Sequence, residues 1–91
     1  MQHVILTLTN SVGLHARPAA QLVQTASRFQ SNITVRNVTR DTPVANAKSI
    51  LAVLALGAEC DHVIEISAEG PDEVEALATL QRLVETRFGE E

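Results

Sequence analysis

Apolar and polar positions alternate in several segments of the chain, a period that is typical of β-strands with one buried face. The alternation is clear over residues 3–9, 33–38 and 62–67. Residues 42–46 could form a further strand, but Pro43 confines it to a sheet edge or a bulge, because proline lacks the N–H that a strand ladder needs. The pattern therefore predicts a sheet of four strands.

Three other segments have apolar residues at intervals of three or four positions, which predicts helices. They cover residues 16–29, residues 49–56 and a final segment that opens at Pro71 and ends at Gly89. The buried stripe of this last helix is expected to consist of Leu77, Leu80, Val84 and Phe88. The order βαββαβα predicts an α+β fold, an open-faced sandwich in which three helices cover one face of a four-stranded antiparallel sheet.

Size and composition fit one domain that covers residues 1–91. Hydrophobic residues make up 45% of the chain, which is enough for one core. No apolar run approaches the roughly 20 residues that a membrane-spanning helix needs. Cys60 is the only cysteine and cannot form an internal disulfide, which fits a reducing compartment. We therefore expect a cytoplasmic protein that does not associate with membranes.

The net charge of −4 is unevenly distributed along the chain. Residues 1–58 carry five basic residues and one acid, whereas residues 59–91 carry two basic and ten acidic residues. This division predicts a neutral-to-basic functional face that meets acidic surfaces of partners. Nucleic acid is a poor candidate partner, because the basic residues are few and scattered and are not accompanied by aromatic residues for stacking.

Residues 13–20, with the sequence GLHARPAA, carry the candidate chemistry. They place His15 and Arg17 at the start of the first helix, and Pro18 suits its first position because the φ of proline is already helical. The first N–H groups of a helix have no internal acceptor, and the helix dipole makes this end partly positive. Residues 1–40 contain no acid, so this helix end is suited to an external anion, of which phosphate is the usual one.

His15 is the candidate acceptor of such a phosphoryl group, because a free imidazole is largely neutral at neutral pH and keeps a nucleophilic lone pair. Interactions at a helix end contribute about 0.3–1 kcal/mol each, and hydrogen bonds from Arg17 would be roughly twice as strong as neutral ones. Such energies position a transferable group without trapping it, which favours a carrier. The plainer alternative is that His15 only caps the helix and that Arg17 is only solvated.

The segment GLHARPAA resembles the active-site motif of the HPr family, the histidine-containing phosphocarrier proteins of the phosphoenolpyruvate-dependent sugar phosphotransferase system. The similarity continues through QLVQTASRF at residues 21–29, NAKSIL at residues 46–51 and SAEG at residues 67–70. It covers nearly the whole chain. The resemblance supports the α+β sandwich and implies a phosphoryl carrier that is not an enzyme.

The resemblance also implies roles for individual residues and partners. His15 would form a transient phosphohistidine that Enzyme I loads and an Enzyme IIA-type domain unloads, and Ala16 and Arg17 would contact the phosphoryl group. A monomer is expected, without a cofactor or a metal. Val12, Gln24 and a longer connection at residues 38–43 depart from the family pattern. They resemble HPr-like domains that belong to or serve larger phosphotransferase proteins, so dihydroxyacetone phosphorylation and nitrogen-linked phosphotransfer are alternative pathways.

Ser49 is predicted to cap the short helix of residues 49–56, because a serine hydroxyl accepts a hydrogen bond from an N–H two or three residues further on. Capping alone explains this residue. In some lineages of the HPr family the matching serine is phosphorylated by a kinase/phosphorylase, so the resemblance also suggests a regulatory site at Ser49. A regulatory adaptor that works through Ser49 is therefore an alternative function, although it would not need His15.

The helix of residues 49–56 is too short to bury apolar residues on every face. Some of its side chains are therefore expected to be exposed near the candidate site, where they would form a docking patch for partners. The predicted patch, with two flanking basic residues, consists of Ala16, Ala20, Ile50, Leu51, Arg28 and Lys48. The alternative is that these apolar residues belong to the core.

The remaining chemical signals are weak. His3 and His62 lie in or beside predicted strands and are interpreted as structural residues. Cys60 and His62 lack a second Cys or His pair at zinc spacing, so no metal site is expected. A small enzyme with His15 as general base would need an orienting carboxylate, and the first 40 residues provide none.

Overall fold

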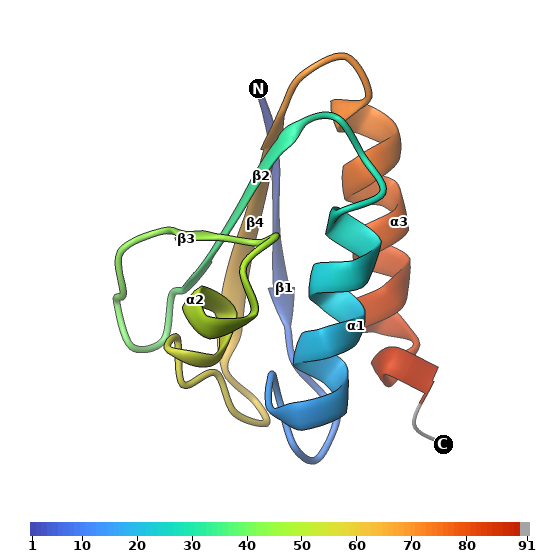
Figure 1. Cartoon of the computed structure of the whole chain (residues 1–91). Coiled ribbons are helices and arrows are strands. Elements are labelled where there is room, and N and C mark those ends of the chain that lie inside the picture. Colours follow the sequence, from blue (N-terminus) through green and yellow to red (C-terminus); the bar gives the residue numbers. More distant parts are fainter. Residues whose placement is uncertain (90–91) are drawn as a thin grey trace.

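The computed structural model describes residues 1–89. Its four strands form one antiparallel sheet with the order β1-β4-β2-β3, and the helices cover one face of it (Figure 1). The strands are β1 (Gln2–Thr7), β2 (Asn32–Asn37), β3 (Ala45–Asn46) and β4 (Val63–Glu69). The predicted α+β open-faced sandwich with the order βαββαβα is therefore confirmed.

The strand residues alternate between a buried face and an open face, as their sequence predicts. In β4, Ile64 and Ile66 are completely buried, whereas Glu65 between them lies on the open face. The register aligns Ile66 with Val4 of β1 and Val35 of β2, so apolar side chains form rows under the helices. Strand β3 has only two residues at the sheet edge, next to Pro43, where the sequence predicts a strand that cannot lie in the centre.

The helices are α1 (Ala16–Ala26), α2 (Ile50–Leu54) and α3 (Glu73–Glu85), and a short 3-10 turn (Arg87–Gly89) follows α3. Helices α1 and α3 lie side by side along the sheet, and the short α2 packs against α1 and β3 (Figure 1). Most of the core between sheet and helices is aliphatic. The largest fully buried aliphatic side chains are Leu8, Leu14, Leu22, Ile33, Ile64, Ile66 and Leu80.

Three predicted helix ends are wrong. Helix α2 ends at Leu54 and not at residue 56, because the N–H groups of residues 56 and 57 donate to carbonyl oxygens three residues back. Helix α1 ends at Ala26 and not at residue 29, because the N–H groups of Arg28 and Phe29 donate to carbonyl oxygens three residues back, as in a 3-10 turn. Helix α3 ends at Glu85 and not at Gly89. Arg87 and Phe88 have φ values of 55° and 57° in the left-handed region, so they leave the helix. Phe88 is nevertheless in the core, with 2% of its surface exposed.

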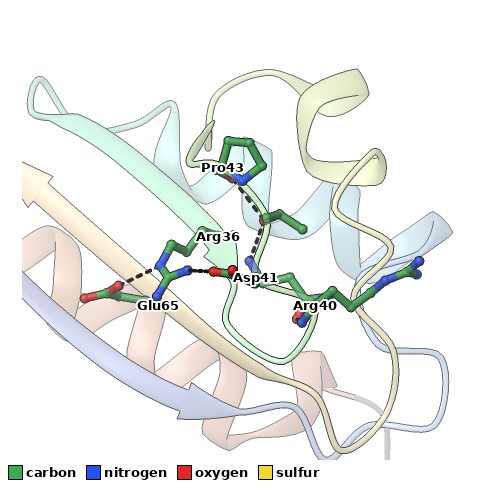
Figure 2. Close-up of polar contacts among 7 residues, drawn as sticks. Arg36, Arg40, Asp41, Pro43 and Glu65 are labelled. Carbon is green, nitrogen blue, oxygen red and sulfur yellow. Dashed lines mark hydrogen bonds and ion pairs between the residues drawn. The ribbon is translucent and has the colours of Figure 1, made fainter.

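A polar cluster ties the long connection between β2 and β3 to the open face of the sheet (Figure 2). Arg36 donates from Nε to Glu65 at 3.1 Å and from a terminal nitrogen to Asp41 at 3.4 Å. The neighbouring Asn37 is completely buried, and its amide nitrogen donates to the carbonyl oxygen of Leu56 at 3.2 Å. Arg36 therefore forms ion pairs within the fold, although it is one of the five basic residues of the basic segment 1–58.

Asp72 connects the start of α3 to the turn between α1 and β2. It sits at the N-cap of α3 but does not cap it; its carboxylate instead accepts from the Ser31 hydroxyl and from the N–H groups of Gln30 and Ser31, the last two at 2.9 and 3.0 Å. The hydrogen bond from the Ser31 hydroxyl is the main cause that lowers the pKa of Asp72 below its usual value, and the bond from Gln30 adds to it. These contacts favour the charged carboxylate.

The Asp72→Asn variant is expected to unfold at a lower temperature than the wild type at neutral pH. Because the folded-state pKa of Asp72 lies below the unfolded value of 3.8, its charged form stabilises the fold above that value and loses this effect as the pH falls through the folded pKa. The difference between variant and wild type should therefore shrink towards about pH 2. Melting curves across this range measure it, and a difference independent of pH would contradict the prediction.

Candidate functional site

His15 stands at the N-cap of α1 with an extended backbone, φ −118° and ψ 154°. Its side chain is exposed and makes no capping hydrogen bond. The following residue, Ala16, has a φ of 49°, in the left-handed region that disfavours L residues. Helix α1 begins at Ala16, so Pro18 is its third residue, and the prediction that Pro18 occupies the first helical position is wrong. The imidazole is thus presented to solvent directly at the start of the helix.

The loop before His15 is held in place by close backbone packing. Gly13 has a φ of 60°, and a Cβ atom at this residue would lie 2.4 Å from the carbonyl oxygen of Ala58. The N–H of Leu14 donates to that same oxygen at 2.8 Å, and the Leu14 side chain is completely buried. The loop therefore places the Leu14 side chain in the core and leaves the His15 side chain at the surface.

The electrostatics of this helix start agree with the prediction of an anion site. The first turn of α1 contains no acid, and its leading N–H groups have no acceptor within the helix. Arg17 is exposed and adds a positive charge in the same turn. Its Nε donates to the side-chain oxygen of Gln21 at 3.3 Å, with the Gln21 amide in the orientation that its neighbours require. The arrangement can bind an anion next to the imidazole of His15.

An open depression of about 360 Å³ adjoins His15. Its walls include Val12 from the loop before α1 and Glu59 and Cys60 from the turn before β4. Neither Cys60 nor Glu59 was predicted to lie beside His15. No local sequence pattern indicates this proximity, because tertiary contacts bring the two segments together. Among them are the hydrogen bonds from the Leu14 N–H to Ala58 and from the Asp61 N–H to Leu8.

Ser49 has the structural role that its sequence predicts. It stands at the N-cap of α2, where its hydroxyl accepts a hydrogen bond from the N–H of Ala52 at 3.3 Å. Its side chain is partly exposed. The two residues that follow it, Ile50 and Leu51, begin α2 with 39% and 77% of their surfaces exposed. The expectation that α2 leaves apolar residues at the surface is therefore confirmed.

The predicted docking residues differ in how freely they could meet a partner. Ala16 at the start of α1 is exposed, and so is Arg28 in the turn after the helix. Ala20 is partly exposed. Lys48 is partly buried, and its Nζ donates to the carbonyl oxygen of Phe29 at 2.8 Å. Its charge therefore acts first on the backbone just after the C-terminal end of α1, where the helix dipole favours a cation.

The other two histidines have different environments. His3 is exposed on β1. His62 is partly buried, and its Nδ1 lies 3.1 Å from the backbone N–H of Glu59 and 3.1 Å from the amide nitrogen of Asn37. Because Glu59 can only donate here, Nδ1 must be the acceptor and the ring proton sits on Nε2. This geometry supports the structural interpretation of His62.

Two further observations concern metal ions and membranes. Across residues 1–89, His, Cys, Asp and Glu side chains nowhere gather in a group of three that could bind a metal ion. In the same part of the chain, every helix is too short or too polar to span a membrane.

Comparisons with known proteins identify the family. Residues 3–86 match the family model described as PTS HPr component phosphorylation site. The chain is 51% identical over 82 residues to the phosphocarrier protein HPr of Treponema pallidum, with 90% of each chain covered. It is also 47% identical over 83 residues to the multiphosphoryl transfer protein of Vibrio cholerae. This match covers 91% of this chain but 21% of that protein.

A solved structure has the same fold along the whole chain. The HPr of Thermoanaerobacter tengcongensis superposes with a TM-score of 0.94 at 48% sequence identity, and the match covers 100% of this chain and 99% of the other. The chain therefore belongs to the HPr family, the phosphocarrier proteins of the phosphotransferase system.

Proposed function

We propose that His15 accepts a phosphoryl group from phosphorylated Enzyme I and passes it to an Enzyme IIA-type domain. The observation that carries this assignment is an exposed imidazole at an electropositive helix start without acids, with Arg17 in the same turn. The lone pair of an imidazole nitrogen attacks the phosphorus atom, and the bond between phosphorus and the donor breaks. The new negative charges then lie against the N–H groups of α1 and the Arg17 guanidinium.

The energies of these contacts suit a carrier that releases its group again. Each helix-end interaction contributes about 0.3–1 kcal/mol and up to about 2 kcal/mol when it is partly buried. We expect the chain to catalyse no reaction of its own, and to act as a cytoplasmic monomer without a cofactor. Ala16 would offer its N–H to the phosphoryl oxygens together with Arg17, since both residues lie in the first turn.

Partners would dock on the exposed part of α1 and α2. Leu51 and Ile50 provide an apolar surface on α2, which packs against α1. Arg28 adds a positive charge that suits an acidic partner, whereas Lys48 contributes less because its Nζ is already bonded to Phe29. The docking face would therefore be apolar with a basic rim, so that acidic partner surfaces approach it favourably.

Incubation with phosphoenolpyruvate and Enzyme I, followed by mass spectrometry, tests the assignment. The chain is expected to gain one phosphoryl group only when both are present, and to lose it in mild acid, because a phosphorus–nitrogen bond to imidazole is acid-labile. Label that appears without Enzyme I, or that persists in acid, would contradict the carrier function. Purified Enzyme IIA-type domains of different pathways, added next, distinguish sugar uptake from dihydroxyacetone phosphorylation and nitrogen-linked phosphotransfer.

Regulation at Ser49 is a second candidate function, favoured by the position of its hydroxyl. This hydroxyl is partly exposed and directly precedes the exposed Ile50 and Leu51. A phosphoryl group transferred there by an HPr kinase/phosphorylase would add close to two negative charges at the docking face. Helix α2 would tolerate the modification because anions are favourable at a helix N-terminus.

The Ser49→Asp variant is expected to keep the fold and to exchange phosphoryl groups with its partners about three- to tenfold more slowly, because one negative charge then repels acidic partner surfaces. Aspartate and asparagine both cap helices as well as serine does. Ser49→Asn is therefore the matched neutral control and should stay within about twofold of the wild-type rate. Stopped-flow transfer from phosphorylated Enzyme I measures the difference. Equal rates for the two variants would argue against the regulatory role.

A further inference from the structure

Gln21 lies one helical turn after Arg17 on the same side of α1, since residues four apart are neighbours on a helix. Its amide contacts two groups. The nitrogen donates to the carbonyl oxygen of Phe88 at 2.9 Å, and the oxygen accepts from Arg17 Nε at 3.3 Å. The reverse orientation would place oxygen against oxygen and N–H against N–H, so the hydrogen-bond partners decide the assignment.

The Phe88 end of this chain of contacts is rigidly held. The ring of Phe88 has 2% of its surface exposed, and the backbone of Arg87 and Phe88 is left-handed in both residues. The carbonyl oxygen of Phe88 is therefore placed by a side chain that belongs to the core. Gln21 is bonded to this oxygen on one side and to Arg17 on the other, so it connects the C-terminal turn to the candidate phosphate site.

The choice of Arg17 nitrogen that bonds to Gln21 matters for phosphate binding. A guanidinium has five N–H donors, one on Nε and four on the two terminal nitrogens. With Nε bonded to Gln21, the terminal nitrogens stay available for two oxygens of a phosphoryl group, and bidentate contacts of this kind are among the strongest. Within residues 1–89, the structure shows no hydrogen bond or ion pair from these terminal nitrogens.

We propose that Gln21 is a positioning residue for phosphoryl transfer, which holds the Arg17 guanidinium in the orientation that receives the phosphoryl group on His15. The inference rests on the proposed function of His15 and Arg17. Gln21 does not touch the phosphoryl group itself. It restricts a long flexible side chain before the group arrives, and such preorganisation favours the transition state in which charge develops.

The test uses Gln21→Met, which keeps the length and helix preference of the side chain but removes both hydrogen bonds. At saturating concentrations of the chain, turnover with phosphorylated Enzyme I should fall about three- to tenfold, the size expected for one lost hydrogen bond of average strength. The KM should stay close to the wild-type value, because the docking patch is unchanged. In a proton–nitrogen correlation spectrum, the Arg17 Nε–H signal should show faster exchange with water in the variant.

A double-mutant cycle separates positioning of Arg17 from direct contact with a partner. In the Arg17→Lys background no Nε–H of a guanidinium remains, so Gln21→Met should cause no further loss. An undiminished loss in that background, or a loss that appears in KM alone, would overturn the proposal. If wild-type protein takes up no phosphoryl group, the function of His15 fails instead. The Arg17 exchange measurement then still decides whether Gln21 holds the guanidinium, and unchanged exchange in Gln21→Met would reject that contact.

Discussion

The His15→Ala variant is expected to gain no phosphoryl group from phosphoenolpyruvate and Enzyme I, whereas the wild type gains one. Alanine offers no nucleophilic atom, so the loss should be complete and not partial. The free energy of unfolding should change by less than about 0.5 kcal/mol, the usual range for surface substitutions. The reason is that His15 is exposed and its side chain makes no capping hydrogen bond with α1. Mass spectrometry and urea denaturation measure the two effects.

The other two histidines of the chain provide matched controls. His3→Ala, on the exposed side of β1, should be phosphorylated like the wild type. His62→Ala should also be phosphorylated, but it should be destabilised by about 0.5–1.5 kcal/mol because the hydrogen bond from the N–H of Glu59 is lost. Phosphorylation that persists in His15→Ala and disappears in His3→Ala or His62→Ala would refute the assignment of His15.

The Gly13→Ala variant is expected to lose about 3 kcal/mol or more of its free energy of unfolding, since an added Cβ combines a left-handed backbone with overpacking. The Cβ would lie 2.4 Å from the carbonyl oxygen of Ala58 and 2.5 Å from the Cα atom of Glu59. Both are backbone atoms and cannot turn away as a side chain would. The loop that presents His15 must shift, so phosphoryl transfer should slow even where the variant remains folded.

Gly89→Ala is the matched control for the left-handed backbone alone. Gly89 has a φ of 76°, and a Cβ there would meet no atom within 4 Å. This variant should lose only about 1–2 kcal/mol, the cost of a left-handed L residue. Urea denaturation of the two variants isolates the packing term. Equal losses would show that the contact between Gly13 and Ala58 contributes nothing.

Elements with a clear local period were predicted correctly, because their signal depends on which side chains face the core. The strands, the three helices and their order follow from apolar spacing, and the ends of the elements do not. The apolar spacing of the last helix continues to Phe88, but α3 ends at Glu85. A left-handed turn buries the Phe88 ring in the structure, and another helical turn could also have buried it. Periodicity cannot distinguish these two solutions.

The sequence by itself determined the core chemistry of this protein: His15 and Arg17 stand within one turn of a helix start without acids, and a helix start exposes N–H groups wherever it occurs. Only the tertiary structure decided what surrounds them. The depression with Glu59, the outward turn of His15 and the contact of Gln21 with Phe88 all join residues far apart in sequence. Such neighbours are set by how the helices and loops pack on the sheet, and packing leaves no period in the chain.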